Sequence, residues 1–83
     1  MKKRKLLQKI LNNPKNVRFS DAQLVVEAFG FRVSRTVGGH HIFVHSRVKE
    51  IVNLQNANGQ AKSYQIKQFL QLIERYNLEM EEQ

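Results

Sequence analysis

The chain has 83 residues, and its 14 Lys and Arg outnumber its 7 Asp and Glu, which gives a formal net charge of +7. A domain of this size buries only about 60% of its unfolded surface, so it forms one small core without a deep cofactor cavity. Apolar residues make up 41% of the chain, there is no cysteine, and no apolar run approaches the ~20 residues of a membrane helix, which excludes disulfides, thiol catalysis and membrane spans.

The first predicted element is a basic helix over residues 3–12. Its apolar face is formed by Leu6, Leu7, Ile10 and Leu11. Pro14 cannot continue a helix and pushes the preceding residue out of helical geometry, so the helix is expected to end at residue 12. The mixed sequence around this basic helix indicates no secretory signal, and the chain is expected to act in the cytoplasm.

A second helix is predicted from Ser20, which forms a capping box with Gln23. Phe19 and Leu24 can form a hydrophobic staple across the same start, and Gly30 is a natural C-terminal stop. The predicted buried face consists of Leu24, Val25, Ala28 and Phe29.

The period of the pattern then changes from helical to alternating, which predicts strands over residues 31–37 and 40–45. Gly38-Gly39 between them is the signal of a two-residue hairpin turn. A third strand is predicted over residues 51–54, followed by a polar loop over residues 55–62.

The last helix is expected over residues 64–76, with Ser63 as its cap, and residues 77–83 form an acidic tail that is expected to fray. The fold class is therefore α+β, in the order α-α-β-β-β-α. The core domain, residues 19–76, is a three-stranded antiparallel sheet with helices packed on one face and the other face open.

Charge is unevenly distributed along this single domain of residues 1–83. Residues 1–73 hold thirteen bases and three acids, a net +10, whereas residues 74–83 hold four acids and one base. A basic body of this kind favours a polyanionic partner, either a nucleic acid or an acidic protein.

Three histidines fall within six residues, at His40, His41 and His45. Histidine exchanges a proton near neutral pH, so these residues are candidates for general acid–base catalysis. Successive residues of a strand point to opposite faces, and His41 and His45 lie about 13 Å apart at ~3.3 Å per residue. One active histidine is therefore more economical than a pair, and neither a metal site nor a small-molecule cofactor site is expected.

Basic and aromatic residues around the hairpin are candidate RNA contacts. They are Arg32, Arg35, Arg47 and Lys49, with His45 and Phe43. If Ile42 and Val44 point into the core, Phe43 lies on the open face with His41 and His45, where it can stack on a base.

The segments Ala28-Phe-Gly-Phe31 and Arg35-Thr-Val-Gly-Gly-His-His-Ile-Phe-Val-His45 resemble the HicA toxin family, also called YcfA-like mRNA interferases. The resemblance covers residues 8–76. It implies a fold like that of double-stranded-RNA-binding domains, metal-independent cleavage of mRNA by one histidine, and a HicB-type antitoxin that covers this histidine. By the same resemblance, Gly38 and Gly39 match the turn and His40 the catalytic histidine, with His41 as the alternative.

Two departures from the family pattern bear on activity. Gly39 stands where Ser is usual, and Asn53 and Gln55 occupy the region in which many members have Pro and His. Neither Asn nor Gln titrates, so a non-catalytic RNA-binding module or an inactive antitoxin-binding relative of the same fold is the alternative to an endoribonuclease. DNA binding ranks behind both, because no helix-turn-helix spacing is present.

Overall fold

The computed structural model describes residues 2–81 and confirms the α+β class. Its elements are α1 (Lys2–Asn12), α2 (Phe19–Ala28), β1 (Arg32–Val37), β2 (His40–His45), β3 (Val48–Ala57), β4 (Gln60–Ala61) and α3 (Ser63–Tyr76). The four strands form one antiparallel sheet in the order β1-β2-β3-β4. Among the described residues, no helix is long and apolar enough to cross a membrane.

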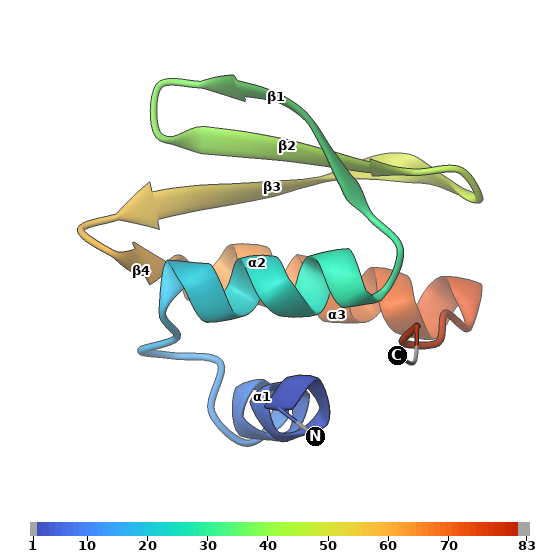
Figure 1. Ribbon diagram of the computed structural model, residues 1–83, viewed down its shortest axis with the longest axis horizontal. Helices are drawn as coiled ribbons and strands as arrows, with labels where there is room; N and C mark the ends of the chain where they lie inside the picture. The colour runs from blue at the N-terminus through green and yellow to red at the C-terminus, as the bar shows by residue number, and fades with distance from the viewer. Residues whose placement is uncertain (1, 82–83) are drawn as a thin grey trace.

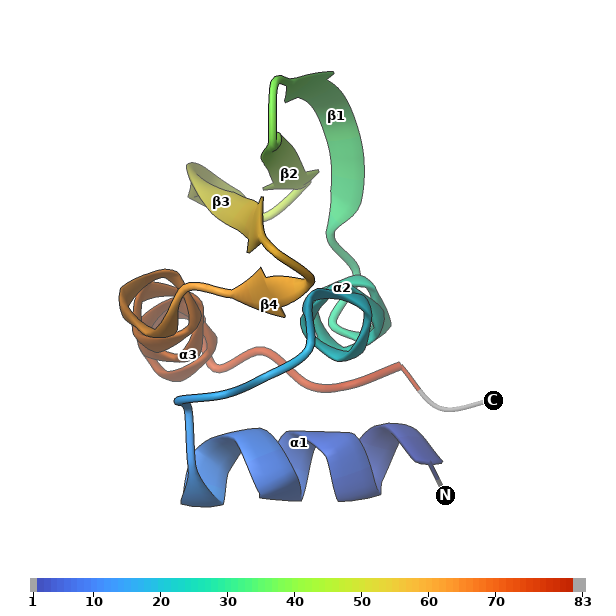
Figure 2. The ribbon, with the colours of Figure 1, turned by 90° about the vertical axis from the view of Figure 1, so that its left-hand side faces the viewer.

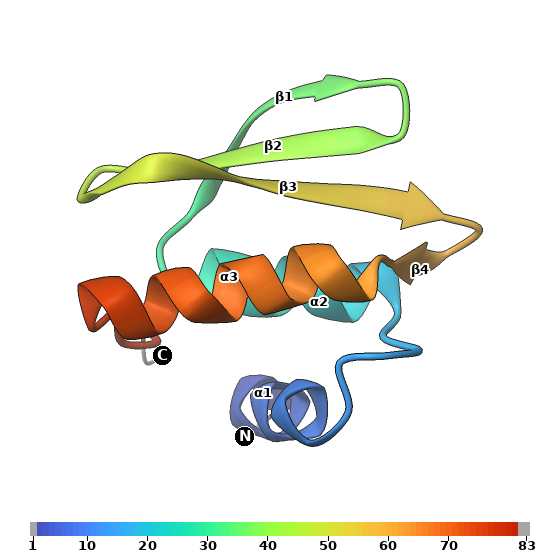
Figure 3. The same cartoon turned by 180° about the vertical axis from the view of Figure 1, so that it is seen from behind.

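The elements form three layers (Figure 1). Helices α2 and α3 lie side by side under one face of the sheet, and Figure 3 shows α3 running beneath β3. Helix α1 packs below them, on the side away from the sheet (Figure 2). The largest fully buried side chains come from strands and helices alike, and include Phe31, Phe43, Leu54 and Ile66. The predicted arrangement, with helices on one face and the other face open, is therefore correct.

The third strand is longer than predicted, and a fourth strand follows it. The segment 55–62, expected as a loop, contains the end of β3, a tight turn and β4. Asn58 and Gly59 both have positive φ, at 55° and 86°, which allows the chain to reverse within two residues. Asn-Gly is a strong hairpin signal. It is hard to recognise in this sequence because β4 pairs with β3 through only two residues, and the residues on both sides of the turn are mostly polar.

Helix α2 begins at Phe19 rather than after a Ser20 cap. Arg18 is the flanking residue, and no described side chain caps the helix, so the predicted capping box is wrong. The β3–β4 hairpin supplies backbone partners instead: Gly59 O accepts the Phe19 N–H at 2.9 Å, and Arg18 bridges to Gln60. The staple is wrong as well, since 44% of Leu24 is exposed.

The last helix ends at Tyr76 as predicted, but its start and the segment that follows it differ from the prediction. Lys62 flanks the start of α3, no described side chain caps it, and Ser63 is already helical. At the other end Asn77 adopts φ 53°, and the N–H groups of Asn77 and Leu78 donate to the carbonyls of Glu74 and Ile73. This Schellman motif turns the chain back so that Leu78 is buried. The expected fraying is therefore wrong for residues 77–81, and residues 82–83 lie outside the described part.

Candidate nucleic-acid interface and active site

Strand alternation decides which face of the sheet carries each histidine. Phe43, Val52 and Leu54 are buried against the helices, so His40, Ile42 and Asn53 lie on the opposite, open face. In the register of the sheet His40 is the partner of Val37 on β1 and of Gln55 on β3. Ile42 is the next residue of β2 after His40 that points to the open face. Its partner on β1 is Arg35, which therefore lies on the same face. The open face thus combines an imidazole, a guanidinium and two amides.

His40 is held by a side chain of the neighbouring strand. Its Nδ1 lies 3.2 Å from Oδ1 of Asn53, and both residues are half-buried. With the Asn53 oxygen as acceptor, Nδ1 carries the hydrogen and Nε2 keeps its lone pair. An imidazole in this state can accept a proton from a bound substrate.

His41 and His45 share the other face, as strand alternation predicts, and that face is turned toward the helices. The His41 ring packs on Phe19 with centroids 4.6 Å apart, and its buried Nδ1 has no hydrogen-bond partner among residues 2–81. The His45 ring packs on Phe31 at 4.9 Å, and its Nδ1 accepts the Arg47 backbone N–H at 3.0 Å. These contacts give both residues packing roles and leave His40 as the histidine on the open face.

The expected stacking role of Phe43 is wrong, because Phe43 is 0% exposed and forms part of the core. The alternating pattern of β2 is compatible with two orientations of the strand. Either Phe43 and His41 point toward the helices, or Ile42 and Val44 do. The sheet buries the first set because the phenyl ring fills the space above the helices, whereas 42% of Val44 stays exposed. The apolar surface of the open face comes instead from Val37, Val44 and Ile51.

The hairpin turn that carries His40 lies at one end of the molecule. Gly38 has φ 60°, and the Gly39 carbonyl accepts the Asn56 N–H at 3.0 Å, which ties the turn to the end of β3. The β3–β4 turn and the starts of α2 and α3 lie at the same end (Figures 1 and 2). We call it the turn end.

Sequence reasoning missed three basic residues at the turn end. Lys15 and Arg18 belong to the connection before α2, and Lys62 lies between β4 and α3; all three are exposed. A charge count along the chain treats them as ordinary loop residues. A signal that could have identified them is their position, since each lies within four residues of the start of α2 or α3. The antiparallel topology places the starts of these two helices beside the hairpin turn.

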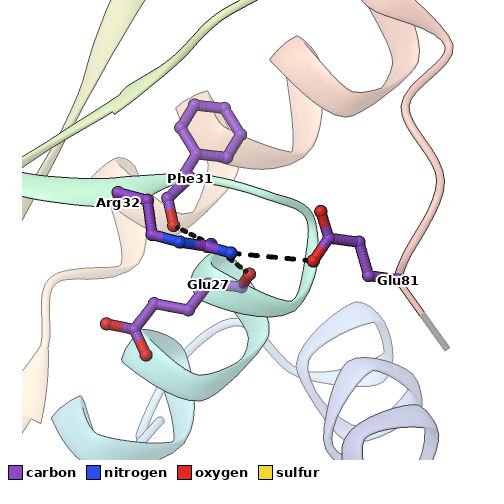
Figure 4. Close-up of polar contacts among 4 residues, drawn as sticks. All are labelled: Glu27, Phe31, Arg32 and Glu81. Atoms are coloured by element: carbon purple, nitrogen blue, oxygen red, sulfur yellow. Dashed lines mark hydrogen bonds and ion pairs between the residues drawn. The ribbon is translucent and has the colours of Figure 1, made fainter. Parts of the chain in front are cut away.

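Arg32, expected to contact RNA, is held by protein groups (Figure 4). Its guanidinium donates to the carbonyls of Phe31 at 2.9 Å and Glu27 at 3.2 Å, and lies 3.8 Å from the Glu81 carboxylate. Arg32 therefore joins β1 to α2 and to the C-terminal segment.

The remaining expected RNA contacts lie away from His40. His45 and Arg47 line a polar cleft of about 480 Å³ together with Glu79 and Glu81, at the end opposite the turn end. Lys49 is exposed near the start of β3. The acidic segment gives this end a mixed charge, so the predicted contacts divide into two separate groups. Those at the turn end are Gly38, Gly39, His40 and Arg35.

Within residues 2–81, no three His, Asp or Glu side chains come together in a way that could hold a metal ion. Comparison with models of known protein families, with curated proteins and with solved structures gave no match for this chain.

Proposed function

We propose that the protein is an endoribonuclease of the HicA type, a toxin that cleaves mRNA in the cytoplasm with His40 as its proton-transfer residue. The observation that carries the proposal is the position of His40. It lies on the open face, beside the hairpin turn, with Nδ1 3.2 Å from Oδ1 of Asn53 on the neighbouring strand.

The chemistry follows from that orientation. Nε2 of His40 takes the proton of a ribose 2′-hydroxyl, and the 2′-oxygen attacks the adjacent phosphorus. The bond from phosphorus to the 5′-oxygen breaks, and that oxygen is protonated from water. The products are a 2′,3′-cyclic phosphate and a 5′-hydroxyl. No metal takes part in this scheme, so a chelator should leave the cleavage rate unchanged.

Positive charge at the turn end supports binding of the phosphate backbone. Arg35 shares the open face with His40, and Lys15, Arg18 and Lys62 lie exposed at the turn end. Cations in such positions attract RNA without regard to sequence and stabilise charge that develops on the phosphate. A HicB-type antitoxin would inhibit the enzyme by covering the same open face, where 63% of Val37 and 54% of Ile51 are exposed.

The test is induced expression of the wild type, His40→Ala and His41→Ala, followed by growth measurement and by analysis of RNA integrity. We expect the wild type to arrest growth and degrade mRNA, and His40→Ala to do neither while it keeps RNA affinity. Purified protein should cleave an RNA oligonucleotide and leave the same oligonucleotide intact when a 2′-deoxy residue replaces the attacking ribose. Cleavage that persists in His40→Ala contradicts the proposal.

The second candidate is an RNA-binding module without catalysis. It is favoured by the neighbours of His40, since neither Asn53 nor Gln55 titrates and the other two histidines face the helices. In that case the wild type binds single-stranded RNA and leaves it intact, and His40→Ala changes affinity only slightly.

A further inference from the structure

A second recess lies at the turn end, on the side of α2 away from the sheet. It has a volume of about 150 Å³ and is formed by the end of α1, the connection 13–18 and the first turn of α2. We call it the α1 cleft. Its apolar wall comes from Ile10 and Val17, which are buried, and from half-buried Leu6.

The polar part of the lining of the α1 cleft is mainly basic. Three exposed bases line it, Lys9 from α1 and Lys15 and Arg18 from the connection 13–18, against one carboxylate, that of Asp21. Three cations to one anion make the cleft attractive to a polyanion. Asn13 adds an amide, whose Oδ1 accepts the Lys15 N–H at 3.1 Å and fixes the connection at this point.

We propose that the α1 cleft binds one unpaired nucleotide of an RNA strand, with its base against the apolar wall and its flanking phosphates on Lys9, Lys15 and Arg18. This inference rests on the RNA-binding function proposed above and adds a second contact, distinct from the open face around His40.

The composition of the lining favours a nucleotide over a bare anion. A phosphate ion alone would pair with Lys9, Lys15 and Arg18 and would leave the apolar wall of the cleft uncovered. A nucleobase presents an apolar face to such a wall and a polar edge to the amide of Asn13 and the carboxylate of Asp21. A recess of about 150 Å³ has the scale of one planar base.

One ring contact connects the lining of the α1 cleft with the strand that carries His40. Arg18, at the edge of the cleft, is followed by Phe19, whose ring packs on His41. His41 is adjacent to His40 but points to the opposite face of the sheet. An RNA strand that reaches His40 across the turn end thus passes Arg18 before it reaches the cleft.

Nuclear magnetic resonance on the His40→Ala protein tests the ligand class. Adenosine and uridine 5′-monophosphates are titrated against ribose 5-phosphate and a tetraglutamate peptide, and the methyl signals of Leu6, Ile10 and Val17 are followed. We expect the nucleotides to shift these signals and the two base-free anions to leave them in place. Equal shifts with ribose 5-phosphate or tetraglutamate overturn the inference, because the cleft would then bind charge alone.

A matched pair of variants tests the role of the cleft in RNA binding. Lys9→Trp fills the cleft and removes one cation, whereas Lys5→Trp makes the same change one turn earlier on α1, outside the cleft lining. Because Lys9→Trp removes both the space for the base and one phosphate contact, we expect it to weaken the affinity for single-stranded RNA about tenfold, and Lys5→Trp to leave the affinity nearly unchanged.

Equal affinity of the two Trp variants overturns the inference about the α1 cleft. It leaves the proposed function intact if both variants still cleave RNA through His40 at saturating substrate. If the proposed endoribonuclease function is wrong, the result is different: the wild type cleaves no RNA, whether or not the cleft binds a nucleotide. Circular dichroism melting of both variants identifies any effect that comes from unfolding of α1.

Discussion

Nδ1 of His40 and Oδ1 of Asn53 are 3.2 Å apart across the β2–β3 ladder, and the two residues are separated by thirteen positions in the sequence. The antiparallel register pairs Asn53 with Ile42 and so places its side chain diagonally beside His40 on the open face. Asn53 does not titrate, so it can fix the tautomer of His40 without competing for the proton. This gives Asn53 a positioning role.

Asn53→Ala should lower the cleavage rate at saturating RNA by roughly tenfold, part of the 10²–10⁴-fold that general acid–base catalysis supplies. RNA affinity should stay the same, because Asn53 holds the imidazole and not the phosphate backbone. Asn53→Asp places a carboxylate against Nδ1, which favours the protonated imidazole, so the pH–rate profile should move to higher pH. Single-turnover kinetics between pH 5 and 9 measure both effects.

Gln55→Ala is the matched control, since Gln55 pairs with His40 in the register, whereas the side-chain contact of His40 within residues 2–81 is with Asn53. It should leave the pH–rate profile in place. A profile that is identical in Asn53→Asp and wild type means that Asn53 does not position His40. A drop in melting temperature common to all three variants would instead indicate a structural role.

The sequence predicts the element types and the hairpin well, because the alternation of residues 31–45 and the Gly-Gly turn are local signals. It does not predict the orientation of β2. His41, Phe43 and His45 on one side and Ile42 and Val44 on the other are both plausible inward sets. The choice depends on how the β2 side chains pack against α2 and on ring contacts with Phe19 and Phe31, residues outside the strand.

Phe43→Ala tests the packing role that the structure gives to this ring. A fully buried Phe replaced by Ala costs about 3–5 kcal/mol, which approaches the whole stability of a small domain. The variant should therefore be largely unfolded at 37 °C, as shown by thermal melting. Phe43→Leu keeps most of the volume and should stay folded with unchanged RNA affinity. Loss of affinity in folded Phe43→Leu would mean that the ring contacts RNA after all.

The helix starts show a second limit of local reasoning. Ser20 with Gln23, and Ser63 before the last helix, are sound capping signals, yet neither forms a side-chain cap. At α2 the first N–H of the helix, that of Phe19, donates to the Gly59 carbonyl of the β3–β4 turn, forty residues away in the sequence. A long-range backbone contact therefore moves the cap position from Ser20 to Arg18, which lies at the turn end.

Arg35 and Arg32 provide a matched pair on one strand. Arg35→Gln should weaken RNA binding and reduce the slope of log affinity against log salt by about 0.7, the value for one phosphate contact with single-stranded nucleic acid. Arg32→Gln should leave RNA binding unchanged, because its guanidinium is bonded to Glu27, Phe31 and Glu81. It should instead lower the melting temperature. Filter binding at several salt concentrations distinguishes the two variants. Equal salt slopes for Arg35→Gln and Arg32→Gln would contradict the assignment of RNA binding to Arg35 and of a structural role to Arg32.

A carboxylate on β3 is bonded to the last turn of α3. The Tyr76 hydroxyl donates to Oε1 of Glu50 at 2.6 Å, and the Arg75 guanidinium to Oε2 at 2.7 Å. The Tyr76 hydrogen bond, followed by the backbone N–H of Glu50 itself and by Arg75, lowers the pKa of Glu50 below its ordinary value of 4.5, although partial desolvation opposes the shift. The same hydrogen bond raises the pKa of Tyr76 above 10.0.

The two pKa shifts define the pH range in which the contact between Glu50 and Tyr76 stabilises the fold. Since the pKa of Glu50 is lower in the folded state, its stabilising effect is present above 4.5 and is lost as the pH falls through the lowered pKa. Since the pKa of Tyr76 is raised, its effect is present below 10.0 and is lost as the pH rises through the raised value.

Glu50→Gln and Tyr76→Phe should each lower the melting temperature at pH 7. The difference between wild type and Glu50→Gln should narrow toward pH 3, and that between wild type and Tyr76→Phe should narrow at both extremes. Differences that stay constant from pH 3 to 11 would mean that the carboxylate and the hydroxyl do not stabilise the fold through this bond.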